Sequence, residues 1–326
     1  MQAKSWSKVI TLFILLAILI TMPVLSACGG GAPETTAPAP ETTAPAPETA
    51  EFDVVKAAVA EYLASPAGNT KASDLQMSIA DDAAPYIVSL RSADDYAAGH
   101  IPGAVNLKFG EISTLPIDEK VLVYCYTGQS ASFATATLGM LDYDVSNLKH
   151  GMSSWSDNPD VYKKRYSGSA GLSTETTANA GSTNAMPVIE NTDSNDDAEI
   201  VKAAALTVAP KYISSADLNM KIADGEEMTI LSIRKADMYA VGHIPGAINA
   251  PYGTAIIDAL DKLNPDAPVY VYCYTGHTAA QSAALLQMLG YDAYSVSFGM
   301  CGWSDDSEVT KGVCFTPEMS LGLATE

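Results

Sequence analysis

A duplication within the chain constrains its fold more than any other sequence feature. The hexapeptide GHIPGA occurs at residues 99–104 and again at 242–247, and VYCYTG occurs at 123–128 and at 271–276. The two offsets, 143 and 148 residues, are far longer than the roughly 20–50 residues of solenoid repeats. The sequence therefore predicts one domain that is present twice.

Composition sets the limits of these two copies in the 326-residue chain. Residues 29–50 are rich in Pro, Thr, Glu and Ala, and residues 167–197 are polar with few large apolar side chains. Such stretches bury little apolar surface and are typical of spacers. We interpret 28–50 as a Pro/Thr-rich tether, 51–166 as domain 1, 167–197 as a mobile linker and 198–326 as domain 2. We expect the two domains to fold independently.

The first 27 residues resemble a lipoprotein signal peptide. Lys4 and Lys8 precede an apolar run over residues 9–22, and the sequence Leu-Ser-Ala then leads to Cys28. This order is typical of a bacterial lipobox, whose cysteine becomes a lipid-bearing N-terminus. An ordinary signal peptide or an uncleaved anchor is the alternative. We expect an extracytoplasmic protein that is anchored to the bacterial cell membrane through Cys28.

The net charge of the chain is −20, from 18 basic and 38 acidic residues. A surface this acidic repels polyphosphate, which excludes nucleic acid as a partner.

Within each copy, short β-branched runs alternate with Ala- and Leu-rich segments. The strands expected in domain 1 are 86–90 and 121–124, with a helix over 130–141; in domain 2 they are 229–233 and 269–272, with a helix over 278–289. This alternation predicts an α/β fold with a mainly parallel sheet and helices on both faces.

A cysteine lies between a strand and a helix in both copies. Cys125 and Cys273 each begin a loop that reads Cys-Tyr-Thr-Gly. Ligands bind at the carboxyl ends of parallel strands, where a helix N-terminus offers free amides and lowers the pKa of a thiol. A buried structural cysteine is the alternative, but the repetition of the frame favours two reactive thiols that can carry an anionic sulfur.

These motifs together resemble the rhodanese superfamily, in tandem. Each copy has an Arg at a strand end, then GHIPGA, the Cys loop, and a Gly and Trp segment that ends at Trp155 or Trp303. The resemblance implies two rhodanese-like domains, each with a five-stranded sheet flanked by helices. It also implies transfer of sulfane sulfur through a cysteine persulfide, without a metal or other cofactor.

Several positions depart from the common family pattern. Ser130 and Thr278 stand where many active loops carry Arg, and His150 and Phe298 replace one of two glycines before the late Trp. Dual-specificity phosphatases, a related group, need an Arg six residues after the Cys, and this chain has Ala131 or Ala279 there. The pattern is closer to the loops of small thiosulfate sulfurtransferases.

The candidate site residues follow from these motifs. Cys125 and Cys273 are the predicted catalytic residues. The predicted substrate-binding residues are Arg91, Tyr126, Thr127, Gly128, Gln129 and Ser130 in domain 1, and Arg234, Tyr274, Thr275, Gly276, His277 and Thr278 in domain 2.

Some of these residues have a simpler structural interpretation. The two arginines either pin the loop or bridge a carboxylate such as Asp94 or Asp237. Ser130 and Thr278 are expected to cap their helices. Positive charge on His277 would favour the Cys273 thiolate. We expect His100 and His243 to hold neighbouring backbone, and the two tryptophans to anchor the cores.

Cys301 and Cys314 remain after the other cysteines are assigned. A structural disulfide is the first interpretation, because the predicted compartment permits it. Alternatively, Cys301 resolves a persulfide or sulfenate on Cys273.

The sequence thus predicts a lipid-anchored sulfurtransferase. Its expected partners are a small sulfur-containing anion such as thiosulfate, a thiol or cyanide acceptor, and the membrane. A non-catalytic rhodanese-like module that binds sulfur species or a membrane partner is the alternative, and a thiol redox protein is a third possibility.

Overall fold

The computed structural model describes residues 48–116 and 118–326. All of them belong to one compact unit. The predicted signal peptide, Cys28 and nearly all of the tether lie outside the described residues. Within the part of the chain that is described, no helix is both long and apolar enough to cross a membrane.

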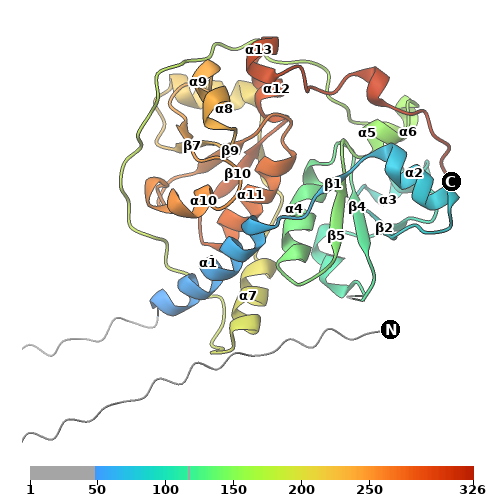
Figure 1. Cartoon of the computed structure of the whole chain (residues 1–326), viewed down its shortest axis with the longest axis horizontal. Coiled ribbons are helices and arrows are strands. Elements are labelled where there is room, and N and C mark those ends of the chain that lie inside the picture. Colours follow the sequence, from blue (N-terminus) through green and yellow to red (C-terminus); the bar gives the residue numbers. More distant parts are fainter. Residues whose placement is uncertain (1–47, 117) are drawn as a thin grey trace, which may run out of the picture. The chain divides into compact units, whose positions relative to one another are not determined.

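Each copy contains a five-stranded, all-parallel sheet (Figure 1). The first has the order β1-β5-β4-β2-β3 and the second the order β6-β10-β9-β7-β8. The first sheet consists of β1 (Asn69–Thr70), β2 (Tyr86–Ser89), β3 (Val105–Asn106), β4 (Val121–Tyr124) and β5 (Val145–Leu148). The second consists of β6 (Tyr212–Ile213), β7 (Thr229–Ser232), β8 (Ile248–Asn249), β9 (Val269–Tyr272) and β10 (Ala293–Val296). The predicted fold class and the four predicted strands are confirmed.

The central strands β4 and β9 are buried along their whole length. Their sequences, VLVY and VYVY, are continuous apolar runs, as expected for parallel strands with both faces covered. Helices cover these faces in both copies. Those of copy one are α2 (Ala72–Ala80), α3 (Ala93–Ala97), α4 (Gln129–Gly139), α5 (Met152–Trp155) and α6 (Pro159–Tyr162). Those of copy two are α8 (Ser215–Ala223), α9 (Ala236–Val241), α10 (Ala255–Asp258), α11 (His277–Met288), α12 (Gly299–Trp303) and α13 (Ser307–Thr310).

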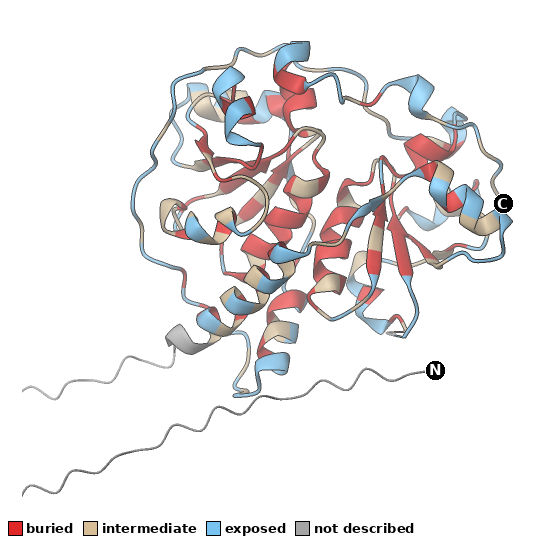
Figure 2. Ribbon diagram, in the orientation of Figure 1, coloured by how far each residue is buried: buried red, intermediate tan, exposed pale blue. Residues whose placement is uncertain are grey.

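The helices that follow the two central strands, α4 and α11, pack against each other. Nearly every residue of both is buried, because each lies between its own sheet and the other copy (Figure 2). One hydrophobic cluster therefore contains residues of both copies, including Phe133 of α4 and Leu285 of α11. The two domains share a core.

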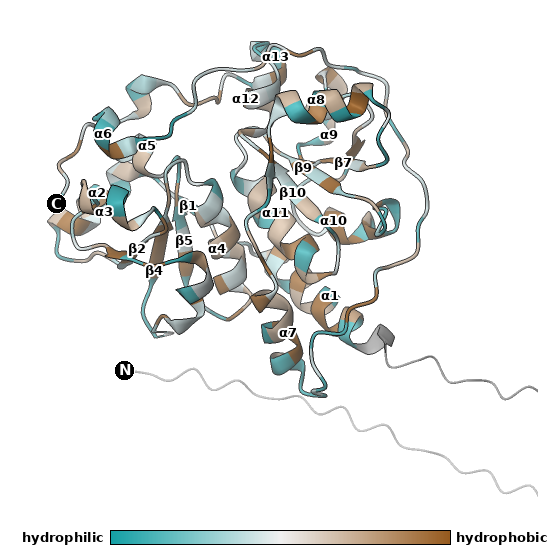
Figure 3. Ribbon diagram, turned by 180° about the vertical axis from the view of Figure 1, so that it is seen from behind, coloured by the Kyte–Doolittle hydropathy of each residue, from teal (hydrophilic) through white to brown (hydrophobic). Residues whose placement is uncertain are grey.

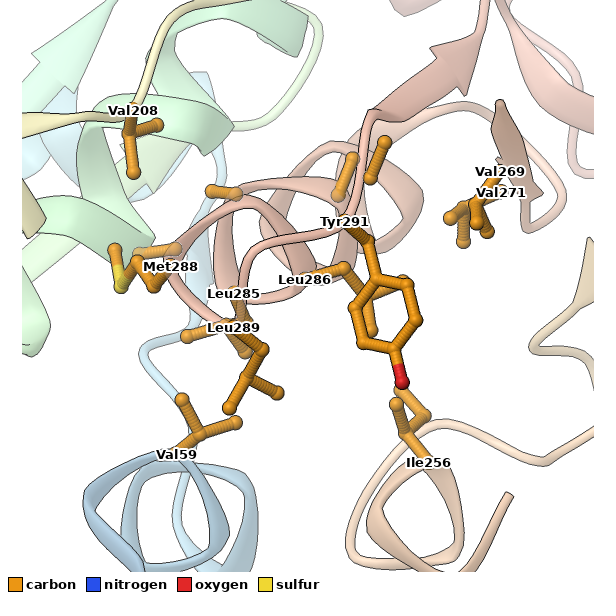
Figure 4. Packing of buried hydrophobic residues seen from close by; sticks show 14 of the residues in the cluster. Val59, Val208, Ile256, Val269, Val271, Leu285, Leu286, Met288, Leu289 and Tyr291 are labelled. Atoms are coloured by element: carbon orange, nitrogen blue, oxygen red, sulfur yellow. The ribbon is translucent and has the colours of Figure 1, made fainter. Parts of the chain in front are cut away.

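Two further helices, which precede the sheets, extend this shared core. They are α1 (Glu48–Ala64) and α7 (Asp197–Leu206), which contact each other and lie side by side in Figures 1 and 3. Although α1 precedes the sheet of copy one, its Val59 points toward Leu285 of α11 in copy two and toward Leu289, the residue that caps the end of this helix (Figure 4). Helix α7 in turn contacts α4 of copy one.

The predicted mobile linker is instead bound along its first part. The chain between α6 and α7 runs around copy two (Figure 1). Residues 169–175, here called the first strap, hydrogen-bond to copy two: Ala170 N donates to Gly302 O, and Leu172 N donates to Trp303 O. Glu175 forms an antiparallel bridge with His243. The prediction of a free spacer is wrong here, because backbone partners in copy two fix its course.

A matching segment crosses in the opposite direction. Residues 320–326, the second strap, follow copy two and hydrogen-bond to copy one: Leu321 N donates to Ser154 O, and Leu323 N donates to Trp155 O. The two straps read SAGLSTE and SLGLATE. Each copy thus binds a segment of the chain that follows the other, and separate folding of the two domains stays a prediction.

The straps hydrogen-bond to the two tryptophans and to the histidines of the GHIPGA motifs. Trp155 and Trp303 are buried in the cores, as predicted, and their indole N–H groups donate to Ala324 O and Ser173 O. His100 and His243 hydrogen-bond through Nδ1 to backbone carbonyls four residues earlier, which confirms their structural role.

Candidate functional site

Both predicted catalytic cysteines lie at the carboxyl end of a central strand. Cys125 follows β4 and Cys273 follows β9, and in each case a helix begins within four residues. The loop amide of Gly128 donates to Cys125 Sγ at 3.2 Å, and that of Gly276 donates to Cys273 Sγ at 3.1 Å. The helix N-termini add the positive end of their dipoles, so the loops favour a negatively charged sulfur.

The loop glycines are required by backbone conformation. Gly128 has φ 83° and Gly276 has φ 86°, in the left-handed region where other residues are strained. These glycines are the N-caps of α4 and α11, and neither helix has a side-chain cap. The prediction that Ser130 and Thr278 are the caps is therefore wrong, because both lie inside the first helical turn.

A second backbone segment supports each loop. In copy one, Met152 N donates to Cys125 O at 2.9 Å, and Ser153 N donates to Tyr126 O at 3.0 Å. Gly151 allows this approach, since a Cβ there would clash with the carbonyl of Cys125. Met300 and Cys301 make the same contacts with the Cys273 loop. The Gly and Trp segment thus fixes the direction of the loop carbonyls.

The two thiols are nearly inaccessible. Cys125 is 2% exposed and Cys273 is 5% exposed, and each belongs to a hydrophobic cluster. Burial at this level admits only small reagents and protects a bound sulfur from water.

The two predicted arginines are buried and bind backbone carbonyls. Arg91 donates to Val161 O at 2.8 Å and to Gly99 O at 2.6 Å. Arg234 donates to Val309 O at 3.0 Å and also to Gly242 O. The expected bridge to Asp94 or Asp237 is wrong, because carbonyl oxygens take the guanidinium N–H groups instead. A direct contact with substrate stays a prediction.

The tyrosines that follow the cysteines lie beside these arginines, with ring centroids 5.8 Å from the guanidinium in copy one and 5.6 Å in copy two. The Tyr126 hydroxyl donates to Asp95, and this hydrogen bond is the main cause of a lowered pKa for the Asp95 carboxyl. The buried hydroxyl of Tyr274 has no hydrogen-bond partner among the described residues.

Gln129 and His277, the first residues of α4 and α11, each hydrogen-bond to the other copy. Gln129 Oε1 accepts a hydrogen bond from Phe298 N at 2.9 Å, and His277 Nε2 accepts one from His150 N at 3.1 Å. The remaining polar atoms of these side chains pair within their own loops, Gln129 with Thr127 and His277 with Thr275. The residue at the end of each Cys loop therefore binds the other copy, at the backbone N–H just before the segment that supports the other Cys loop.

His277 is consequently not the charged neighbour that the sequence suggested. The pKa of His277 is lowered to about 3, mainly by burial and in smaller part by the nearby His150 and Lys149. Burial likewise lowers the pKa of His150 to about 4. Both imidazoles are neutral near pH 7, so His277 supplies a hydrogen-bond acceptor to copy one rather than positive charge to Cys273.

A small pocket lies between the two loops. It is lined by residues of both copies, namely Thr127, His150, Ser153, Tyr166, Thr275, Phe298, Cys301 and Phe315. Sequence reasoning did not find this pocket, because no motif indicates that the two loops face each other.

Cys301 and Cys314 form a disulfide in the structure, with their Cα atoms 5.4 Å apart. It joins the segment that supports the Cys273 loop to the chain after α13. Cys301 is therefore not available as a resolving thiol in this state. Among the described residues, no group of three or more His, Cys, Asp or Glu side chains is placed to bind a metal ion.

Comparison with known proteins agrees with this geometry. A model of the rhodanese-like domain matches residues 71–158 and 214–306. Thiosulfate sulfurtransferase GlpE of Pseudoalteromonas translucida is 32% identical over 97 residues, which cover 29% of this chain and 90% of that protein. YrkF of Bacillus subtilis is 27% identical over 97 residues, and the chain spans about half of its length, 52%.

Among solved structures, a rhodanese-like domain protein from Staphylococcus aureus shares 30% identity. The match covers 29% of this chain and 93% of that one, with a TM-score of 0.28. Since the family model matches more than half of the sequence, in two separate places, the chain belongs to the rhodanese family and carries two rhodanese-like domains.

Proposed function

We propose that this protein is a sulfurtransferase that carries sulfane sulfur on Cys125 and Cys273. The observation that supports this most directly is the amide hydrogen bond to each Sγ, at 3.2 and 3.1 Å, at the start of a helix. Family membership and the similarity to a thiosulfate sulfurtransferase support the same reaction class.

The reaction has two displacement steps. A cysteine thiolate attacks the outer sulfur of thiosulfate, a Cys S–S bond forms, the S–S bond of thiosulfate breaks, and sulfite leaves with the electron pair. A thiol or cyanide acceptor then attacks the outer sulfur of the persulfide, and the cysteine leaves as a thiolate. The charge on sulfur is −1 in both enzyme states, so the same loop amide and helix dipole stabilise both.

The nearly complete burial of both thiols favours small reactants. Thiosulfate, sulfite and cyanide fit this restriction better than a folded protein acceptor does. Because the chain is strongly acidic, an anionic donor gains no long-range attraction, and selectivity has to come from the loops themselves.

We further propose that the protein acts outside the cytoplasm, held at the membrane by lipid on Cys28. The motif around Cys28 supports this proposal. Replacing Cys28 with Ser should release the chain from membranes or block its processing. A cleaved Cys28→Ser protein that still fractionates with membranes would contradict it.

The mass of the intact protein after exposure to thiosulfate tests the chemistry. We expect one added sulfur atom per reactive loop, lost at the mutated loop in Cys125→Ser and Cys273→Ser, and no adduct in the double variant. Cyanide should then remove the added sulfur as thiocyanate. If the wild-type protein gains no sulfur, the non-catalytic binding module is the better description.

A further inference from the structure

The Cys125 site contains a residue from the other copy. Tyr212 lies in β6 of copy two, and its hydroxyl donates to Ser130 Oγ in the first turn of α4 at 2.9 Å. Its ring meets Phe133 of α4 edge to face, with centroids 5.5 Å apart. Two separate contacts therefore hold Tyr212 against the N-terminal half of α4, the helix that begins at the Cys125 loop.

The equivalent position in copy one does not do the same for Cys273. Register in the two sheets makes Asn69 the counterpart of Tyr212, since Asn69 pairs with Asn147 and Tyr212 with Ser295 at corresponding places. The Asn69 side chain turns to its own sheet, where it accepts a hydrogen bond from Asn147 at 2.7 Å. The two sites are not equivalent at this point.

Copy two supplies a phenol of its own instead. Tyr252 donates to Gln281 in α11, and Gln281 donates across the interface to Ala67 O at 3.1 Å. By the repeat offsets, their counterparts in copy one are Phe109 and Phe133, neither of which has a polar atom in its side chain. A tyrosine hydroxyl thus bonds the helix that follows each cysteine, Tyr252 on α11 and Tyr212 on α4, but Tyr212 comes from the other domain.

We propose that Tyr212 is a positioning residue for the Cys125 site, contributed by the second copy. Its hydroxyl donates to Ser130 Oγ, which leaves the Ser130 proton free to hydrogen-bond the negatively charged sulfur. A hydroxyl that accepts one hydrogen bond is a stronger donor of its own proton, because the two bonds polarise each other. Desolvation of its hydroxyl, with the Cys125 sulfur as a smaller cause, raises the pKa of Tyr212, although the residue as a whole is 36% exposed; the phenol therefore stays protonated and donates throughout the working pH range.

This inference rests on the proposed function only for the role of the persulfide. In the structure Cys125 Sγ accepts from Gly128 N, and the proposal adds Ser130 as a second donor to the free thiolate as well as to the persulfide. The effect on the thiolate is measured without any sulfur donor. The rate of alkylation of each cysteine by iodoacetamide, followed against pH by peptide mass mapping of the full chain, reports Cys125 and Cys273 separately. Failure of thiosulfate to form an adduct would overturn the proposed function and leave this measurement intact.

Tyr212→Phe removes one hydroxyl and keeps the ring. It should slow the alkylation of Cys125 near neutral pH by roughly two- to tenfold, the range for one net hydrogen bond. Cys273 should be unaffected. Tyr252→Phe is the matched control: its hydroxyl donates to Gln281 and not to Ser130, so the alkylation rate of Cys125 should be unaffected.

Ser130→Ala separates a role through Ser130 from a general packing role. Alone, Ser130→Ala should slow the alkylation of Cys125 as much as Tyr212→Phe does. In the double variant, the alkylation of Cys125 should be no slower than in Ser130→Ala. Three results would each overturn the proposal. They are an unchanged alkylation rate of Cys125 in Tyr212→Phe or in Ser130→Ala, equal changes in rate at both cysteines, and additive effects on the rate in the double variant.

Discussion

His277→Gln is the variant that tests the contact between the two copies most directly. It places in copy two the residue that copy one already has, since Gln129 is the counterpart of His277. Gln129 Oε1 accepts from Phe298 N at 2.9 Å, so a glutamine at position 277 can accept from His150 N in the same way. The variant keeps the hydrogen bond and removes the titrating group.

The expected effect follows from the pKa of His277, which burial lowers from 6.5 to about 3. An imidazole with a lowered folded-state pKa binds fewer protons when folded than when unfolded. Its contribution to stability is complete above pH 6.5 and is lost as the pH falls toward 3. Between about pH 7.5 and about pH 4.5, this single group costs the wild-type protein about 3 kcal/mol of unfolding free energy.

Urea unfolding followed by tryptophan fluorescence measures this difference, because Trp155 and Trp303 are both buried. His277→Gln should have nearly wild-type stability near neutral pH and should lose about 3 kcal/mol less than wild type on acidification. His150 and the carboxylates titrate in both proteins, so their effects cancel in the comparison. Equal losses in the two proteins would show that His277 is not a buried neutral acceptor.

Three further predictions concern the crossing segments and the disulfide. Cys301→Ser should lower the unfolding free energy by about 3 kcal/mol in urea and make Cys314 open to alkylation, because the bridge closes a loop with a sequence separation of 13; an unchanged midpoint would contradict this. Leu323→Ala should cost about 1–2 kcal/mol and speed hydrogen exchange chiefly in copy one, where Leu323 packs. Limited proteolysis of the native protein should leave residues 169–175 uncut, and a first cut inside them would argue for the free linker that composition suggested.

The duplicated motifs predict the fold because they are tied to local geometry. A run such as VYVY becomes a parallel strand wherever both faces are covered, and the glycine three residues after each cysteine allows the left-handed turn that starts the helix. These features need no knowledge of the rest of the chain. Four of the ten described strands, the two helices that follow the cysteines and the sheet class were therefore predictable within a few residues.

The contacts between copies were not predictable from the same motifs. In a repeated sequence, a contact within one copy and a contact across to the other leave the same pattern. His277 stands four residues after Cys273, and sequence distance suggested that the two side chains act together. The helix that begins at His277 turns its side chain toward His150 instead. The binding of the first strap to copy two was not predictable either, because SAGLSTE lies in a polar stretch whose composition is that of a spacer.

The crossing straps place hydrogen-bond partners of each copy outside the domain limits seen in the sequence. Trp303 is fully buried, yet its indole N–H finds its acceptor in Ser173, which follows the first domain. His243, also fully buried, hydrogen-bonds through Nε2 to Thr177 O at 3.1 Å. A copy cut at its family boundaries would leave these polar groups without their partners and would expose the α4–α11 face that forms part of the shared core. Each copy therefore carries the full set of rhodanese motifs, but the unit that satisfies its buried groups is the pair.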